Sequence, residues 1–152
     1  MRIAYLSDLH LEFAAQARPG EGRLAMLPAK ALAPAAGADL VVLAGDVDQG
    51  EAGVAAADAI ARKIGAPVVY VAGNHEAYNR DMGALLTRLR AAAWATDGRV
   101  QLLQGNLVRF WFSGRPLAVL GCVLWTDYAL LGDAGAAMQT AEARMYDHQA
   151  IG

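Results

Sequence analysis

The sequence contains the stretch LVVLAGDVDQG at residues 40–50, in which five apolar residues run directly into glycine and acidic residues. An uninterrupted apolar run rich in β-branched residues is typical of a strand buried on both faces of a sheet. Two further runs share this character, residues 3–6 and residues 68–72. Between the second and third strands, residues 51–64 carry Ala, Val and Ile on one side and end at Gly65, as a helix does. These segments predict a strand, a helix and a second strand parallel to the first.

The remaining segments predict two more helices and several short strands. Residues 11–37 are interrupted by prolines and predict a loop with a short helix as the first crossover. Residues 81–95 repeat leucine at helical spacing, and residues 134–146 are rich in Ala, Met and Glu, so both predict helices. Short turns with the spacing of β-hairpins separate three apolar runs, at residues 100–103, 107–112 and 116–124.

The length and composition of the chain fit one globular domain. A chain of 152 residues with 56% hydrophobic residues can build a single core, and we expect one domain over residues 1–152. The formal net charge of -2 provides no general basic surface, so binding to nucleic acid is not favoured. The mean hydropathy of +0.26 indicates an uncovered apolar face and predicts self-association through an exposed sheet.

Neither membrane insertion nor secretion is indicated. No stretch approaches the roughly 20 apolar residues that cross a bilayer, and Asp8 interrupts the apolar start of the chain before it reaches the length of a signal peptide. The single cysteine, Cys122, lies in an apolar run and predicts a small buried side chain. We therefore expect a cytoplasmic protein with no membrane partner.

Each predicted parallel strand is followed at once by polar residues of the kinds that bind metals. The three segments are Ser7-Asp8-Leu9-His10, Gly45-Asp46-Val47-Asp48 and Gly73-Asn74-His75-Glu76. Ligand sites in open α/β sheets form just beyond the carboxyl ends of the strands, so loops from adjacent strands converge there. Acidic and histidine residues at three successive strand ends therefore predict one shared metal site.

The residue types suggest individual roles in this site. Asp8 and His10, two residues apart in one loop, can offer an oxygen and a nitrogen to one ion. Asp46 suits a bridge between two ions, because a carboxylate between two cations offsets their repulsion. Asn74 offers a carbonyl oxygen to the second ion and its NH₂ group to a phosphate oxygen of a substrate. His75 is placed to contact the substrate and to protonate a leaving alkoxide.

Other acidic residues are open to more than one interpretation. Asp48 and Glu76 are as well explained as hydrogen-bond acceptors that support a ligand, or as turn formers, as by direct metal binding. Asp39 begins its predicted strand at the opposite edge of the sheet, and we expect no part for it in the site. The mixture of carboxylate, imidazole and amide ligands suits two divalent ions such as Mn²⁺, Fe or Zn²⁺ better than Ca²⁺.

These three segments, in this order, resemble the D-x-H, G-D and G-N-H-[ED] motifs of the calcineurin-like metallophosphoesterases. The resemblance implies a four-layered α/β/β/α sandwich with two facing mixed sheets. It also implies that Asp8 and His10 hold the first metal, that Asp46 bridges, that Asn74 joins the second metal, and that His75 acts near the leaving group. A metal-bound hydroxide would attack phosphorus in line.

The family pattern continues with a further strand-end histidine and a Gly-His-x-His motif, neither of which the chain contains. Its three histidines are His10, His75 and His148. We expect the chain to be the N-terminal portion of a longer enzyme; a shortened relative completed by another chain is the other interpretation. His148 has no strand before it and no glycine beside it, which favours a surface or lid position over a ligand.

An aromatic segment follows the last predicted strand. Trp125 and Tyr128 flank Asp127 and can form a wall over the site, with Tyr128 stacking on a ring of the substrate, although core packing is the preferred interpretation of Trp125. The function we expect is hydrolysis of small phosphomonoesters or phosphodiesters. The alternative is a scaffold with the same fold that has lost catalysis and binds a protein partner.

Overall fold

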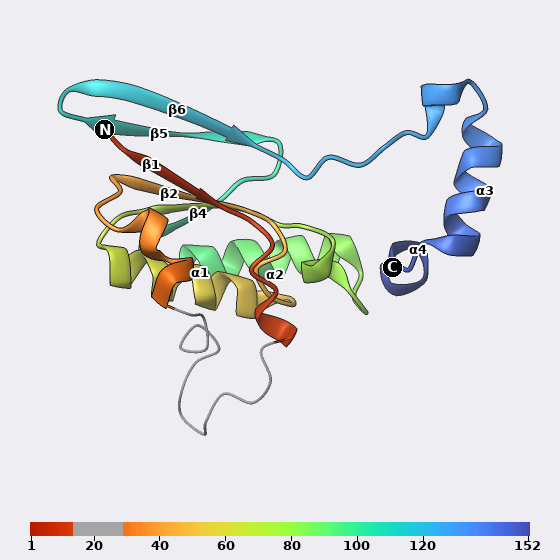
Figure 1. Ribbon diagram of the computed structural model, residues 1–152, viewed down its shortest axis with the longest axis horizontal. Coiled ribbons are helices and arrows are strands. Elements are labelled where there is room, and N and C mark those ends of the chain that lie inside the picture. The colour runs from red at the N-terminus through yellow and green to blue at the C-terminus, as the bar shows by residue number, and fades with distance from the viewer. Residues whose placement is uncertain (14–28) are drawn as a thin grey trace.

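The structure, a computed structural model, describes residues 1–13 and 29–152. Its main sheet contains four parallel strands in the order β1-β2-β3-β4 (Figure 1). The strands are β1 (Ile3–Leu6), β2 (Leu40–Ala44), β3 (Val68–Val71) and β4 (Val100–Leu102). The first three confirm the strands predicted from the apolar runs. Because all four are parallel, their carboxyl ends lie at the same edge of the sheet.

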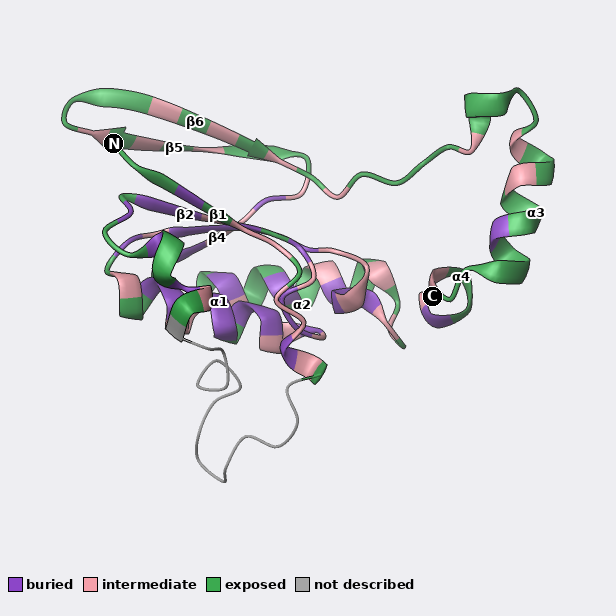
Figure 2. Ribbon diagram, in the orientation of Figure 1, coloured by how far each residue is buried: buried purple, intermediate pink, exposed green. Residues whose placement is uncertain are grey.

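Two helices cover one face of this sheet (Figure 1). Helix α1 spans Glu51–Ile64, as predicted, and ends at Gly65, whose φ of 77° is in the left-handed region that favours glycine. Helix α2 spans Met82–Trp94, and the Asp81 carboxylate caps it by accepting a hydrogen bond from the Ala84 N–H. The sides of both helices that face the sheet are buried, and they form the larger hydrophobic core with the strands (Figure 2).

A two-stranded antiparallel hairpin covers the other face of the sheet. It consists of β5 (Asn106–Phe112) and β6 (Arg115–Gly121). Inward side chains such as Phe110 and Val119 pack against Leu40, Val69 and Leu103 of the main sheet. The prediction that residues 100–103 belong to the same hairpin series is wrong, because these residues pair with β3 and the chain then crosses to the second sheet.

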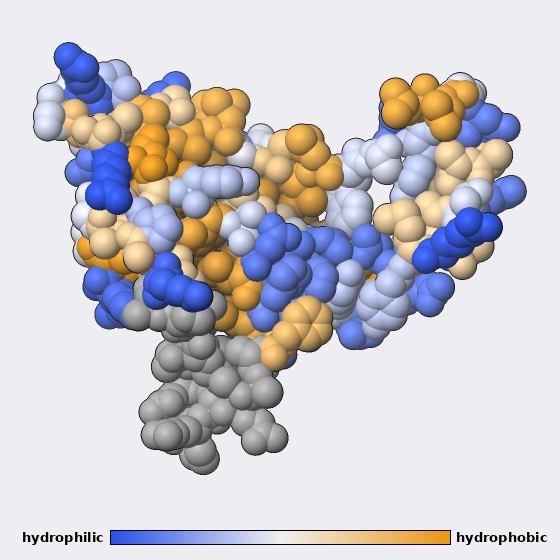
Figure 3. Space-filling view, viewed as in Figure 1, coloured by the Kyte–Doolittle hydropathy of each residue, from blue (hydrophilic) through white to orange (hydrophobic). Residues whose placement is uncertain are grey.

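The outer face of the hairpin is exposed and apolar. Leu107, Trp111 and Leu120 are 41%, 65% and 75% exposed. Apolar side chains gather over the hairpin, and also over the short helix η6 (Ala129–Leu131), in the space-filling view (Figure 3). An uncovered face of this kind is what the positive mean hydropathy predicts. Self-association through it stays a prediction.

Residues 122–152 leave the hairpin as an extended strap that carries the short helix η6 and then two further helices (Figure 1). Helix α3 (Ala134–Arg144) stands apart from the two sheets, and helix α4 (Asp147–Ala150) brings the chain back to the loop that follows β3. The predicted helix at residues 134–146 is confirmed over most of its length. The predicted crossover at residues 11–37 lies partly outside the described residues, with short helices at η1 (Leu11–Phe13), η3 (Ala29–Ala31) and η4 (Ala33–Ala35).

The helix layer, the parallel sheet and the facing antiparallel sheet agree with the predicted α/β class. Within residues 1–13 and 29–152, no helix combines the length and apolar character needed to cross a membrane.

Candidate metal centre

The loops after β1 and β2 lie side by side beyond the carboxyl ends of the strands. The Asp8 N–H donates to the Gly45 carbonyl oxygen at 3.1 Å, and the His10 N–H donates to the Asp46 carbonyl oxygen at 3.0 Å. These bonds extend the pairing of the two strands into their loops. The side chains of both loops are thereby held in one place.

A buried carboxyl group ties the second loop to the third. The Glu76 side chain is fully buried and accepts four hydrogen bonds. Its Oε2 accepts from the backbone N–H groups of Asp46 and Gly73 at 3.1 and 2.7 Å. Its Oε1 accepts from the Val47 N–H at 2.8 Å and the Tyr70 hydroxyl at 2.6 Å. Of the three interpretations open for Glu76, these four hydrogen bonds favour the acceptor that supports the site over the turn former and the metal ligand.

Three predicted ligands have strained backbones. Asp8, His10 and Asp46 have φ values of 54°, 46° and 54°, in the left-handed region that side chains with a Cβ rarely adopt. Such strain persists only where the surroundings fix it, and it concentrates at functional sites. The Asp46 carboxylate also occupies the space beside Gly73, because a Cβ at Gly73 would lie 2.1 Å from Asp46 Oδ1. The backbone conformation of these loops therefore sets the directions of the Asp8, His10 and Asp46 side chains.

Three side chains meet closely enough to hold a metal ion. Ligand atoms of His10, Asp46 and His75 lie within 4.8 Å of one another, and all three residues are half-buried. The imidazole rings of the two histidines are 4.4 Å apart in an edge-on arrangement. Two imidazoles and a carboxylate form a donor set for divalent ions such as Zn²⁺, Mn²⁺ or Fe²⁺. Each residue comes from a different strand-end loop, so the predicted convergence of the loops is present.

Glu12 also belongs to this centre, although the sequence interpretation did not include it. Its Oε1 lies 2.6 Å from His75 Nδ1 and 3.2 Å from His10 Nδ1. A carboxylate can only accept, so both rings donate through Nδ1 and leave Nε2 free. Carboxylates that orient metal-binding histidines in this way are common next to the ligands. The signal available from the sequence was its position two residues after His10.

The environment of Glu12 favours its charged form. Burial acts to raise the pKa of Glu12, but hydrogen bonds from its own backbone N–H and from His75 and His10 outweigh burial and hold the pKa below its ordinary value. The Glu12 side chain is 6% exposed, and its buried Oε2 has no hydrogen-bond partner within residues 1–13 and 29–152. A buried carboxylate oxygen without a partner is costly unless a cation or water satisfies it, which fits a metal centre.

Asp8 and Asn74 lie at the edges of the cluster. Asp8 is 64% exposed at the side chain, with Oδ1 3.8 Å from His10 Nε2, so it lies beside the cluster without completing it. The Asn74 amide nitrogen donates to the Tyr78 hydroxyl oxygen at 2.9 Å and to Asp147 Oδ1 at 2.8 Å. Both amide N–H groups are thus engaged within the protein instead of facing a phosphate, and the carbonyl oxygen is the part of Asn74 left for an ion.

The Tyr78 hydroxyl is held as a donor. It donates to Asp147 Oδ1 at 2.8 Å. Burial, followed by this hydrogen bond, raises the pKa of Tyr78 to about 12. The hydroxyl therefore keeps its proton at neutral pH.

The other candidate residues lie outside the cluster. Asp48 is buried, and its Oδ1 accepts from the Gln49 N–H at 2.7 Å, which is turn-forming behaviour. His148 is exposed and its Nε2 lies 2.7 Å from the Tyr128 hydroxyl, in agreement with a surface position. The Asp127 carboxylate accepts from the Ala129 N–H at 2.9 Å and forms a turn that leads into the short helix η6.

A cavity of about 270 Å³ opens beside the metal-binding residues, and its lining includes Asp46 and Asn74. The segment that follows β6 forms its other wall, from Cys122 to Trp125. Trp125 is 54% exposed, so the prediction that it packs in the core is wrong; it forms a wall of the site. Cys122 is exposed as well, contrary to the expectation of a buried thiol.

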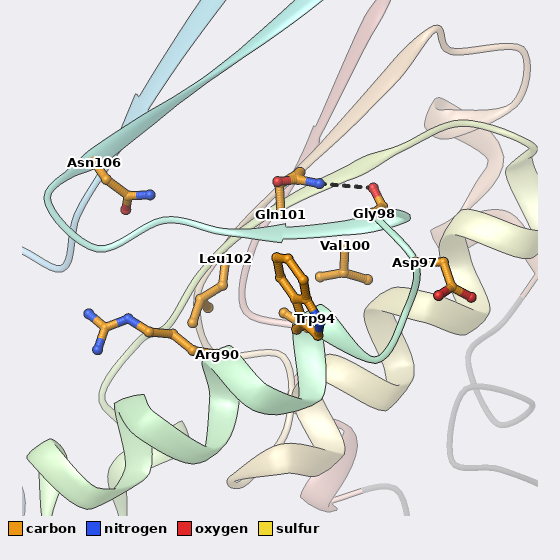
Figure 4. Close-up of a pocket in the computed structure, with 9 residues that line it drawn as sticks. Arg90, Trp94, Asp97, Gly98, Val100, Gln101, Leu102 and Asn106 are labelled. Atoms are coloured by element: carbon orange, nitrogen blue, oxygen red, sulfur yellow. Dashed lines mark hydrogen bonds between the residues drawn. The ribbon is translucent and has the colours of Figure 1, made fainter.

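A larger cavity than this one lies elsewhere, at the free edge of β4. It measures about 520 Å³, and Figure 4 shows Arg90 and Trp94 of α2 facing Val100 and Leu102 across it. Gln101 donates to the Gly98 carbonyl oxygen at its rim. None of the predicted site residues lines this cavity, and we assign it no role in the chemistry.

Comparison with known proteins agrees with the geometry. The chain is similar to the crystal structure of a phosphopantetheinyl hydrolase from Mycobacterium tuberculosis, with a TM-score of 0.68 and 20% identity. The alignment covers 99% of this chain and 55% of that one, so this chain spans about half the length of the solved structure. No match was found among curated protein sequences. The shared fold confirms the predicted architecture.

The sequence profile described as calcineurin-like phosphoesterase matches residues 1–135. This range contains all three strand-end motifs and most of the chain. The chain therefore belongs to the calcineurin-like phosphoesterase family.

Proposed function

We propose that the chain is a metal-dependent phosphoesterase that hydrolyses small phosphomonoesters or phosphodiesters at the cluster of His10, Asp46 and His75. The observation that carries this proposal is the convergence of ligand atoms from three strand-end loops within 4.8 Å of one another, next to an open cavity. Two divalent ions would be held by Asp8, His10, Asp46 and Asn74, with Asp46 between them. Mn²⁺, Fe and Zn²⁺ all suit these donors.

When bound, the ions would supply positive charge for the phosphoryl oxygens and activate a water for attack. The protein residues then have separate tasks. Nδ1 of His75 is hydrogen-bonded to Glu12, so Nε2 is the atom left to pass a proton to the leaving-group oxygen. The Glu12 carboxylate accepts from Nδ1 and so fixes the orientation of the His75 ring. Trp125 forms part of the cavity wall.

A small substrate fits this site better than a nucleic-acid polymer. Among the described residues, the cavity lining contains no lysine or arginine, and the net charge of the chain is -2. Long nucleic acids are bound through several cations along the phosphate backbone. A single phosphoryl group is neutralised by the ions themselves.

The test is hydrolysis of bis-p-nitrophenyl phosphate and p-nitrophenyl phosphate with and without added Mn²⁺. We expect turnover that requires the metal and is abolished by EDTA. Absence of metal-dependent turnover with both esters would contradict the proposal and favour the alternative of a catalytically inactive scaffold that binds a protein partner.

A further inference from the structure

The C-terminal segment docks on the loop that follows β3, beside the metal centre. The Gly152 N–H donates to the Arg80 carbonyl oxygen at 3.0 Å, and the Met82 N–H donates to the Gly152 carbonyl oxygen at 3.1 Å. The ring of Tyr146 packs edge-on against Tyr78, with 5.2 Å between the ring centres. These contacts fix the start of α4 near the third strand-end loop, so Asp147 reaches Asn74 across 73 positions of sequence.

Three side chains there close a ring of hydrogen bonds. One N–H of the Asn74 amide donates to the Tyr78 oxygen, and the other donates to Asp147 Oδ1. The Tyr78 hydroxyl donates its own proton to the same Asp147 oxygen. Every donor in the ring has an acceptor, and each bond is between 2.8 and 2.9 Å long.

The carboxylate decides the orientation of the amide. The oxygen and nitrogen of an asparagine amide have nearly the same shape, so a free side chain can present either one. An ionised carboxylate only accepts hydrogen bonds, and therefore the NH₂ branch must face Asp147. The carbonyl branch then points away from Asp147. Asn74 lines the cavity beside Asp46, so this oxygen is the part of the amide available there.

We propose that Asp147 and Tyr78 are positioning residues that lock the side-chain amide of Asn74 with its carbonyl oxygen available to a metal ion. The inference rests on the proposed function, because the orientation of the Asn74 amide matters for metal binding only if an ion binds beside it. A flipped amide would present two N–H groups to the ion and would repel it. Through Asp147, the α4 segment thus helps to orient a ligand of the metal centre.

The experiment combines two measurements on Asp147→Ala, Asp147→Asn, Tyr78→Phe and the wild-type chain. Without metal, NMR measures how fast the Asn74 side-chain NH₂ protons exchange with solvent. With metal, electron paramagnetic resonance of free Mn²⁺ measures the affinity and the number of ions bound. Glu142→Ala is the matched control, because it removes a carboxylate from exposed helix α3 without touching Asn74.

We expect Asp147→Ala to speed the exchange of the Asn74 NH₂ protons and to weaken Mn²⁺ binding at the ion that Asn74 is proposed to hold roughly 10- to 100-fold, the usual effect of losing a group that orients a ligand. Asp147→Asn keeps one accepting oxygen and should restore part of both properties. Tyr78→Phe should fall between Asp147→Ala and the wild type, and Glu142→Ala should match the wild type.

Unchanged proton exchange in Asp147→Ala would overturn the inference, and so would faster exchange with unchanged Mn²⁺ affinity. If Asp147→Ala does not fold, the graded effects expected for Asp147→Asn and Tyr78→Phe decide the question. A wild-type chain that binds no Mn²⁺ would instead contradict the proposed function, while the exchange measurement would still show whether Asp147 holds the amide.

Discussion

Glu12 accepts a hydrogen bond from the imidazole of His75, with 2.6 Å between Oε1 and Nδ1. The same oxygen lies 3.2 Å from Nδ1 of His10. One carboxylate thus orients both histidines of the centre and directs their Nε2 atoms away from itself. The proposed acid role of His75 depends on this contact.

Glu12→Gln tests that dependence. The variant keeps the shape of the side chain but replaces the carboxylate that accepts from both rings with an amide, which orients the rings less firmly, so we expect kcat to fall roughly 10-fold or more with little change in KM. Kinetics on bis-p-nitrophenyl phosphate with Mn²⁺ measure the rate, and ¹⁵N NMR of the His75 ring reports which nitrogen carries the proton. Glu142→Gln on exposed α3 is the control. An unchanged kcat together with an unchanged ring spectrum would show that Glu12 is not needed.

His75→Ala separates proton transfer from metal binding. General acid catalysis contributes typically about 10²- to 10⁴-fold, so we expect a kcat loss in that range, larger for alkyl esters than for nitrophenyl esters. Alkoxide leaving groups need the proton more than nitrophenolate does. The number of Mn²⁺ ions bound should stay the same. A parallel loss of bound metal would identify His75 as a ligand, as its place in the three-residue cluster allows.

Gly73→Ala probes the packing of the proposed bridging carboxylate. An added Cβ would lie 2.1 Å from Asp46 Oδ1 and 2.7 Å from the Asp46 backbone nitrogen, so Asp46 must move. We expect Mn²⁺ affinity to weaken roughly 10-fold or more, as when a ligand loses its support. Gly83→Ala is the matched control, because its Cβ meets only Asp81 Oδ1 at an ordinary 3.5 Å in helix α2. Equal Mn²⁺ affinity in the two variants would contradict the close packing.

The ion pairs of Asp58, which lies outside the metal centre, predict that the stability of the fold depends on pH. Asp58 accepts hydrogen bonds from Arg99 at 2.6 Å and Arg62 at 2.9 Å, linking α1 to the segment before β4. Burial acts to raise the pKa of Asp58, but the two arginines outweigh burial and lower it. A lowered pKa in the folded state stabilises the fold above the unfolded-state pKa and loses this effect as the pH falls through the folded-state pKa.

Asp58→Asn should therefore lower the free energy of unfolding by roughly 1.5–3 kcal/mol at pH 7, the usual size for hydrogen bonds to charged groups. The difference from the wild type should shrink as the pH falls below about 5. Urea unfolding across this pH range measures both. A difference that stays constant with pH would show that the charge of Asp58 does not stabilise the fold.

The parts of the molecule governed by local pattern could be predicted from the sequence. Continuous apolar runs followed by Gly-Asp or Gly-Asn are explained by buried parallel strands and the loops at their ends. The short turn after residues 100–103 predicts a hairpin, but a short turn does not distinguish a hairpin from a crossing to the facing sheet. The pairing of Val100 with Val68 is set by tertiary packing.

Contacts between distant residues account for what the sequence did not reveal. Glu12 and His75 are 63 positions apart, and Asn74 and Asp147 are 73 apart. No local spacing predicts such pairs. Core packing is the preferred interpretation of Trp125 from the sequence, whereas the structure places it on the wall of the cavity beside Asp46.

The measurement that tests the metal centre most directly is Mn²⁺ binding to the wild-type chain and to Asp46→Asn, monitored by electron paramagnetic resonance. Hydrolysis of bis-p-nitrophenyl phosphate is measured on the same two proteins. Asp46 Oδ1 accepts a hydrogen bond from the backbone N–H of His75 at 3.0 Å, and Asp46 belongs to the same cluster as both histidines. Its charge is proposed to lie between the two ions. We predict that the wild type binds Mn²⁺ and hydrolyses the ester, and that Asp46→Asn stays folded but loses both properties. Full binding and full activity in Asp46→Asn would contradict the assignment.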